Sequence, residues 1–176
     1  MTSQDTYHAF MLDYAAGNLT PSLSVAASIH RLMSSRGDEA ATLWESVRDV
    51  LHKDADCLDR RAPDEQAVSA ALDIIHMDYA DVRWRRGLSG VKYSNMPSAA
   101  GQLMRLEPGQ NVFAHGHSAL EATVILEGAL DDGHGSYQQG DILLAIPGVK
   151  HKPAAFGNNA CTCYVARSPR PFWRLT

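Results

Sequence analysis

The sequence of 176 residues has little cysteine and no long apolar run. Three cysteines are too few, and odd in number, for a disulfide framework. No segment approaches the roughly 20 apolar residues of a membrane-spanning helix, and the first residues lack the basic and apolar parts of a secretory signal. Its 13 glycines and 8 prolines are too few for a disordered or collagen-like chain. We therefore expect a cytoplasmic protein in a reducing compartment, with no membrane partner.

Charge is divided unequally along the chain. Residues 1–76 carry 12 acidic and 6 basic side chains, a net charge of −6, whereas residues 77–176 carry 8 acidic and 10 basic ones, a net charge of +2. An acidic module repels nucleic acid and attracts a basic protein. We expect no direct binding to nucleic acid, although the charge could also be only a solvated surface.

The first half has the apolar period of helices. Four stripes, expected to be buried, are Tyr7, Phe10, Met11 and Tyr14; Val25, Ile29, Leu32 and Met33; Leu43, Val47, Val50 and Leu51; and Val68, Ala71, Leu72 and Ile75. Gly17 and Gly37 are expected to end the first two helices. Thr20-Pro21, Asp38 and Pro63-Asp64 are expected to begin the last three. These helices predict a small bundle at about residues 5 to 76.

The second half has short segments rich in β-formers, separated by turn residues. The predicted strand segments are Val91–Tyr93, Gln102–Leu106, Ala122–Leu126, Ile142–Ala145 and Thr162–Val165. Several short strands with regular turns indicate a closed or double-sheet architecture. The fold class is therefore α+β with two domains: a small N-terminal helical bundle, residues 1–76, followed by a β-rich domain, residues 77–176.

Three histidines and a glutamate in the β-rich half have the spacing of a metal site. His115 and His117 project to the same face of a strand, Glu121 has the same parity, and His151 follows a Pro-Gly turn in a later segment. Three imidazoles and a carboxylate suit a divalent first-row ion. We expect one such ion per chain, with zinc placed first and iron, nickel or manganese as alternatives.

The segments Gly109–Gly128 and Gly140–His151 resemble the cupin motifs G-x5-H-x-H-x3-E-x6-G and G-x5-P-x-G-x2-H. All four metal positions are filled, and Ala155 stands where the second motif usually ends in asparagine, which is not a ligand. The resemblance implies a cupin β-barrel (a double-stranded β-helix, or jelly roll) with its metal inside.

A more specific resemblance covers nearly the whole chain. Tyr14–Leu19 and Val25–His30 are similar to the start of the zinc-binding domain of ChrR-type anti-sigma factors, Asp81–Arg85 to the entry of their cupin domain, and Cys161–Cys163 to their Cys-x-Cys. The resemblance implies a transcription regulator of the stress response. Its helical domain would bind and inhibit an extracytoplasmic-function sigma factor, and its cupin would sense an oxidant or a small ligand.

The helical half departs from that family at its zinc site. His8 and His30 match two family ligands, but Ser34 and Gly37 replace the cysteines, and two imidazoles alone make a weak site. We expect this half to hold metal weakly or not at all, with both histidines on the helix surface as the alternative. Nothing places His52 or Cys57 near His30.

Other features leave alternatives open. Cys161 and Cys163 share one face of a strand, either as a redox-sensitive pair or as two small buried residues. His134, in a glycine-rich turn, is expected to be exposed.

These features are consistent with three functions, of which the anti-sigma function is the first. Candidate contacts with a sigma factor are Phe10, Met11, Met33 and Trp44, which could equally be core residues. The second function is a metal-dependent cupin enzyme, oxygenase-like or isomerase-like, with Arg105 as the best candidate to anchor a substrate. The third is a repurposed binding protein whose helices form a homodimer.

Overall fold

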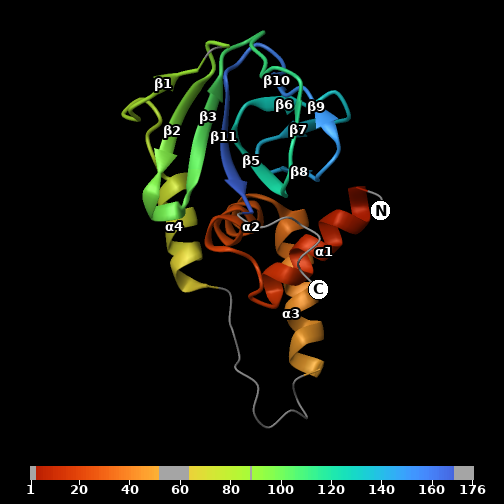
Figure 1. Cartoon of the computed structure of the whole chain (residues 1–176). Coiled ribbons are helices and arrows are strands. Elements are labelled where there is room, and N and C mark those ends of the chain that lie inside the picture. The colour runs from red at the N-terminus through yellow and green to blue at the C-terminus, as the bar shows by residue number, and fades with distance from the viewer. Residues whose placement is uncertain (1–2, 52–63, 88, 169–176) are drawn as a thin grey trace.

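The computed structural model describes residues 3–51, 64–87 and 89–168, so His52 and Cys57 lie outside the described residues. In these residues four helices come first and the strands follow, which confirms the α+β class. Figure 1 shows the helices gathered at one end of the strands, with α2 (Pro21–Met33) beneath the end of β11 (Cys161–Arg167). None of the described helices is long and apolar enough to span a bilayer.

The first two helices bury the residues that their spacing indicated, with one exception. In α1 (Ser3–Ala15) the predicted stripe is buried, and Gly17 follows with a positive φ of 69°. In α2 every residue from Ser22 to His30 is buried, because this helix contacts α3, α4, β5 and β11. Leu32, however, is 46% exposed. Pro21 is the first residue of α2, as predicted, but within the described residues the side chain of Thr20 makes no capping hydrogen bond.

The prediction that Gly37 ends the second helix is wrong. The second helix already ends at Met33, Ser34 is extended, and Gly37 lies in the first turn of α3 (Ser35–Leu51). A Cβ atom on Gly37 would lie 2.5 Å from the carbonyl oxygen of His30. Glycine is therefore needed for the close approach of α3 to α2. Asp38 lies inside α3 and does not begin it.

The predicted buried stripe of α3 is also wrong. Leu43, Val50 and Leu51 are 55%, 63% and 72% exposed, and the buried residues of this helix are Gly37, Ala40 and Ala41. The small residues let α3 pack closely against its neighbours, and its larger apolar side chains are left on the outside.

The fourth helix begins as predicted but buries a different stripe. The carboxylate of Asp64 accepts a hydrogen bond of 3.0 Å from the backbone N–H of Gln66 at the start of α4 (Glu65–Ile75). The buried residues are Ala67, Ala71 and Ile74. Leu72 is 40% exposed, and Ala67 and Ile74 are buried where the sequence predicted their neighbours Val68 and Ile75.

The strands form a six-stranded antiparallel sheet and two smaller sheets. The large sheet has the order β1-β2-β3-β11-β5-β8, and the small ones are β10-β6-β7 and β4-β9. The bounds are β1 (Arg85–Arg86), β2 (Lys92–Met96), β3 (Gly101–Leu106), β4 (His115–Gly116), β5 (Glu121–Glu127), β6 (Ala129–Asp131), β7 (Ser136–Gln138), β8 (Ile142–Ala145), β9 (Lys150–His151), β10 (Ala154–Ala155) and β11, with the 3-10 turn η1 (Pro97–Ala99) before β3. Each predicted strand segment overlaps a strand of the large sheet.

The two faces of the large sheet belong to different cores. Along β5, Ala122, Val124 and Leu126 pack in one buried cluster with the apolar residues of the helices. Ile125 packs instead in a second cluster with Leu143 of β8 and other residues of the β domain. Because β5 is buried on both faces, its central residues 122 to 126 are all apolar except Thr123. The helices and the sheet thus share a core across the proposed boundary at residues 76 and 77.

Candidate metal centre

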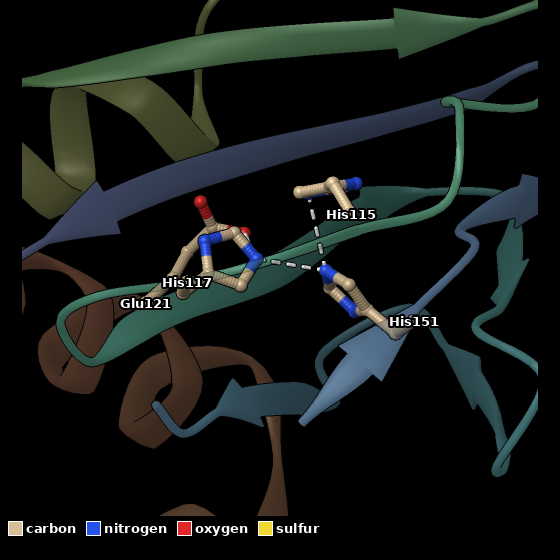
Figure 2. Close-up of side chains that lie close together, drawn as sticks. All are labelled: His115, His117, Glu121 and His151. Carbon is tan, nitrogen blue, oxygen red and sulfur yellow. Dashed lines mark hydrogen bonds and ion pairs between the residues drawn. The ribbon is translucent and has the colours of Figure 1, made fainter. Parts of the chain in front are cut away.

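The structure brings the four proposed metal ligands together (Figure 2). One ligand atom from each of His115, His117, Glu121 and His151 lies within 4.8 Å of all the others. The pairing of β4 with β9 places His115 directly opposite His151. Glu121 is the first residue of β5, and His117 lies in the short segment between β4 and β5.

The three imidazoles point their Nε2 atoms at a common point. The Nε2 of His151 lies 2.8 Å from that of His117 and 3.3 Å from that of His115. The carboxylate atom Oε1 of Glu121 is 3.6 Å from the Nε2 of His117. Such a convergence of nitrogen and oxygen donors is the arrangement that a bound cation requires.

A backbone carbonyl orients one of these rings. The Nδ1 of His115 lies 2.8 Å from the carbonyl oxygen of Phe113, which can only accept a hydrogen bond. In the neutral tautomer that fits this contact the proton of His115 lies on Nδ1, which leaves the lone pair of Nε2 for a cation. The buried Nδ1 of His151 lies 4.0 Å from a carboxylate oxygen of Asp132 and has no hydrogen-bond partner among the described residues.

Burial favours the neutral form of His117 and His151, which is the form that binds metal. Desolvation lowers the pKa of both His117 and His151 below the ordinary value of histidine. Neutral imidazoles are the form that ligates a cation, so little free energy is needed to remove protons at neutral pH. The donor set fits a divalent metal ion, and its chemistry is shared by zinc, iron, nickel and manganese.

Sequence reasoning missed one residue at this site. The Nε of Arg167 donates a hydrogen bond of 2.5 Å to Oε2 of Glu121, whose other oxygen is the one near His117. Arg167 lies opposite Glu121 in the register of β11 and β5. Arg105, the residue proposed as a substrate anchor, bonds Glu127 and Thr162 instead of any proposed ligand, so that proposal loses its support.

The other two histidines proposed as ligands have different environments. His8 is exposed, as expected of a surface residue, but His30 is 1% exposed, so the surface interpretation of His30 is wrong. Both ring nitrogens of His30 have protein partners: Nδ1 lies 2.7 Å from the carbonyl oxygen of Gly140, and Nε2 lies 3.0 Å from the hydroxyl of Tyr7. Gly37 packs against the same residue.

The two cysteines of β11 are adjacent inside the β domain. Their sulfur atoms are 3.4 Å apart, and both side chains are fully buried. The hydrogen bond with Cys161 and desolvation raise the pKa of the Cys163 thiol, which disfavours the reactive thiolate. These facts favour two buried apolar residues, and a redox role for Cys161 and Cys163 stays a prediction.

Other candidate residues are divided between core and surface. Phe10 and Met11, at 3% and 0% exposure, are core residues and are not available to a partner. Met33 and Trp44 are partly buried against the same core. His134 is exposed, as predicted, and its Nε2 lies 2.9 Å from the carbonyl oxygen of Lys150.

Comparison with known proteins extends this picture to both halves of the chain. The family model described as "ChrR Cupin-like domain" matches residues 73–171. The anti-sigma-E factor ChrR of Cereibacter sphaeroides is 28% identical over 90% of this chain and 86% of its own length. The crystal structure of Rhodobacter sphaeroides SigE in complex with the anti-sigma ChrR matches with a TM-score of 0.77 and 26% identity, covering 92% of this chain and 96% of the matched one.

Proposed function

The chain belongs to the ChrR cupin-like family, and on that premise we propose that it is a cytoplasmic anti-sigma factor. Its helices bind an extracytoplasmic-function sigma factor and cover surfaces that the factor needs for polymerase or promoter DNA. Its β domain holds one divalent ion and responds to an oxidant or a small ligand. The observation that supports this proposal is the likeness, over 92% of this chain, to the ChrR that was solved with SigE.

The apolar stripe of α3 is the docking face that we infer for the sigma factor. Leu43, Val50 and Leu51 are each more than half exposed, and their spacing of seven and eight residues places them on one side of the helix. Exposed apolar residues gathered on one face of a soluble protein are typical of an interaction site. An amphipathic helix commonly binds by laying such a stripe into an apolar groove of its partner.

Charge supports a basic partner. Residues 1–76 carry a net charge of −6. A protein that binds DNA carries lysine and arginine for contact with phosphates. The acidic module would attract such a protein from solution and compete with DNA for its basic surface.

The metal ligands are close to the helices along β5. When bound, the ion would supply a Lewis acid with room for a further ligand. Glu121 faces this site, and the next residue, Ala122, packs in the cluster shared with the helices. A shift of β5 at Glu121 would therefore also displace α2, because this helix contacts the strand.

The experiment is to co-purify the full chain with extracytoplasmic-function sigma factors of the same organism and to measure transcription by any factor that it binds in vitro. We expect a stable complex and inhibition. Leu43→Glu or Val50→Glu should weaken binding roughly 10-fold or more, since each places a charge in an apolar interface. Leu72→Glu, on an exposed position of α4, is the matched control and should bind as the wild type does.

Two results would count against this proposal at different levels. No complex at micromolar concentrations, together with unimpaired transcription, would overturn the anti-sigma function. A complex that tolerates both α3 substitutions would leave the function standing and overturn only the docking face.

A metalloenzyme is the second candidate function. A cavity of about 40 Å³ lies beside His115 and Glu121 and could admit a small substrate. Bound iron together with turnover of a small organic substrate by the purified chain would favour this alternative.

A further inference from the structure

Arg167 stands between the metal ligands and the surface of the protein. Its Nε is held by the buried carboxylate of Glu121 at 2.5 Å, but 64% of its side chain is exposed. In the described part of the chain, no other hydrogen bond is seen to its guanidinium group. Among the described residues, the two terminal nitrogens of this arginine therefore have no partner and can bind a ligand.

Two hollows meet at this residue. The inner one is the cavity of about 40 Å³, which is lined by Arg167, Gln102 and Tyr93 as well as by His115 and Glu121. This volume exceeds the roughly 10–15 Å³ that one water molecule needs. The outer one, of about 190 Å³, shares Arg167, Gln102 and Val165 with the inner one and opens along Ala100 and Gly101.

The inner cavity attracts negative charge once the metal is bound. A divalent ion, the Glu121 carboxylate and the Arg167 guanidinium together carry a net charge of +2, and Asp132 behind His151 reduces this only to +1. Tyr93, whose pKa is raised by burial, adds a neutral hydroxyl donor on the cavity wall.

We propose that Arg167 and the metal ion together bind the carboxylate of a small organic acid. The carboxylate lies in the inner cavity, between the ion and the planar guanidinium group, which matches a carboxylate better than any other cation does. The remainder of the acid extends into the outer hollow. This inference rests on metal binding in the proposed function and names the chemical class of the ligand that the β domain detects.

The position of Arg167 gives this binding a route to the helices. Its backbone carbonyl accepts a hydrogen bond of 3.3 Å from Ser22 near the start of α2. The hydroxyl of Tyr164, three residues earlier on β11, donates to the carbonyl of the same Ser22 at 3.3 Å. Arg167, the residue that would bind the acid, therefore also contacts the helices that we propose bind the sigma factor.

The test uses the full chain loaded with cobalt(II), whose visible spectrum reports changes at the metal. Sodium acetate is titrated at constant ionic strength, with inorganic phosphate and chloride in parallel, and metal content is measured for every variant. We expect acetate to change the spectrum saturably and chloride to leave it unchanged. A saturable change with phosphate but none with acetate would overturn the assignment of a carboxylate.

Variants identify the role of Arg167. Arg167→Gln should weaken acetate binding roughly 10- to 100-fold at unchanged cobalt content. Arg167→Lys keeps the charge but not the planar guanidinium group. Its affinity for acetate should lie between those of the wild type and of Arg167→Gln. Arg86→Gln, an exposed arginine on β1, is the control and should bind as the wild type does. If Arg167→Gln loses cobalt, the comparison is made with Arg167→Lys.

Several outcomes would overturn the proposal. These are a wild-type chain that takes up no cobalt, a cobalt spectrum that acetate does not change, and an Arg167→Gln or Arg167→Lys chain with wild-type affinity for acetate. The measurement needs no sigma factor, so a failure of sigma binding would leave it intact and would be recognised separately.

Discussion

The Nδ1 atom of His30 lies 2.7 Å from the carbonyl oxygen of Gly140, and this hydrogen bond joins α2 to the turn before β8. A carbonyl only accepts, so Nδ1 carries a ring proton, and Nε2 pairs with the hydroxyl of Tyr7 at 3.0 Å. The same hydroxyl also donates to the carbonyl oxygen of Arg36 at 3.2 Å. Arg36 stacks over the ring of Tyr7 at 4.0 Å. Hydrogen bonds therefore connect α1, α2 and the β domain at the position where the resemblance implied a zinc ion.

Replacing Tyr7 by phenylalanine tests the contribution of this connection. The change removes the hydroxyl and leaves the buried Nε2 of His30 without its partner. We expect the free energy of unfolding to fall by about 1–3 kcal/mol, measured by urea denaturation of the metal-free chain. Tyr137→Phe is the control, because no hydrogen bond of its hydroxyl is seen within the described residues. Equal stability of Tyr7→Phe and the wild type would contradict the argument.

The pH dependence of stability should report the same histidine. Burial is the largest cause that lowers the pKa of His30 below its ordinary 6.5. The unfolded chain thus binds this proton more readily than the folded chain. The stabilisation that depends on neutral His30 is therefore fully present above about pH 6.5. It is lost as the pH falls from that value toward the lower pKa of the folded state.

The measurement is the urea midpoint of the metal-free chain from pH 8 to pH 5. His117 and His151, whose pKa values are also lowered, contribute in the same direction. In His30→Gln the urea midpoint should therefore still fall with decreasing pH, but less steeply than in the wild type, because His30 no longer titrates. His8→Gln, at an exposed position, is the control. An unchanged slope in His30→Gln would exclude His30 as a titrating group.

Metal content should be about one equivalent per chain, because the only group of metal-ligating side chains found among the described residues is that of the β domain. His151→Ala should remove it, whereas His134→Ala, at a nearby exposed histidine, should keep it. A chelator should lower the melting temperature of the wild type, since free metal at about 100 times its Kd stabilises the fold by about 3 kcal/mol. Two tightly held equivalents, or a melting temperature indifferent to the chelator, would contradict this prediction.

The metal ligands could be predicted from sequence because their relation is mostly local. His115 and His117 share a face through the strand period alone, and the Pro-Gly turn before His151 gives a second local signal. Arg167 could not be found in this way. Its place opposite Glu121 depends on the register of β11 and β5, which shifts between Thr162 and Cys163. Such a shift is a tertiary property that no short spacing reveals.

The helices illustrate a different limit. The period of α3 is visible in the sequence, but periodicity does not say whether an apolar stripe meets a core or a partner. The sequence therefore predicts Leu43 and Val50 in the core, although the structure leaves them exposed. Glycine is typical of helix ends, but at position 37 glycine is required because the backbone of His30 lies so close. One residue type serves both purposes, and only the packing distinguishes them.

Gly140→Ala should separate the contact between the two halves from simple backbone strain. Gly140 has a φ of +86°, and a Cβ atom there would lie 2.6 Å from the carbonyl oxygen of Met33 at the end of α2. Gly157 has the same φ but nothing within 4 Å of its Cβ position. Gly157→Ala should thus cost only the strain of a left-handed alanine, about 1–2 kcal/mol.

Gly140→Ala carries that same strain and must also push α2 away from the turn, which weakens the hydrogen bond from His30. We expect it to be less stable than Gly157→Ala by a further 1–3 kcal/mol or so, measured by urea denaturation. Adding His30→Gln should cost less in the Gly140→Ala background than in the wild type, because the bond is already weakened. Equal losses in the two alanine variants, or full additivity in the double variant, would show that this contact does not hold the helices to the β domain.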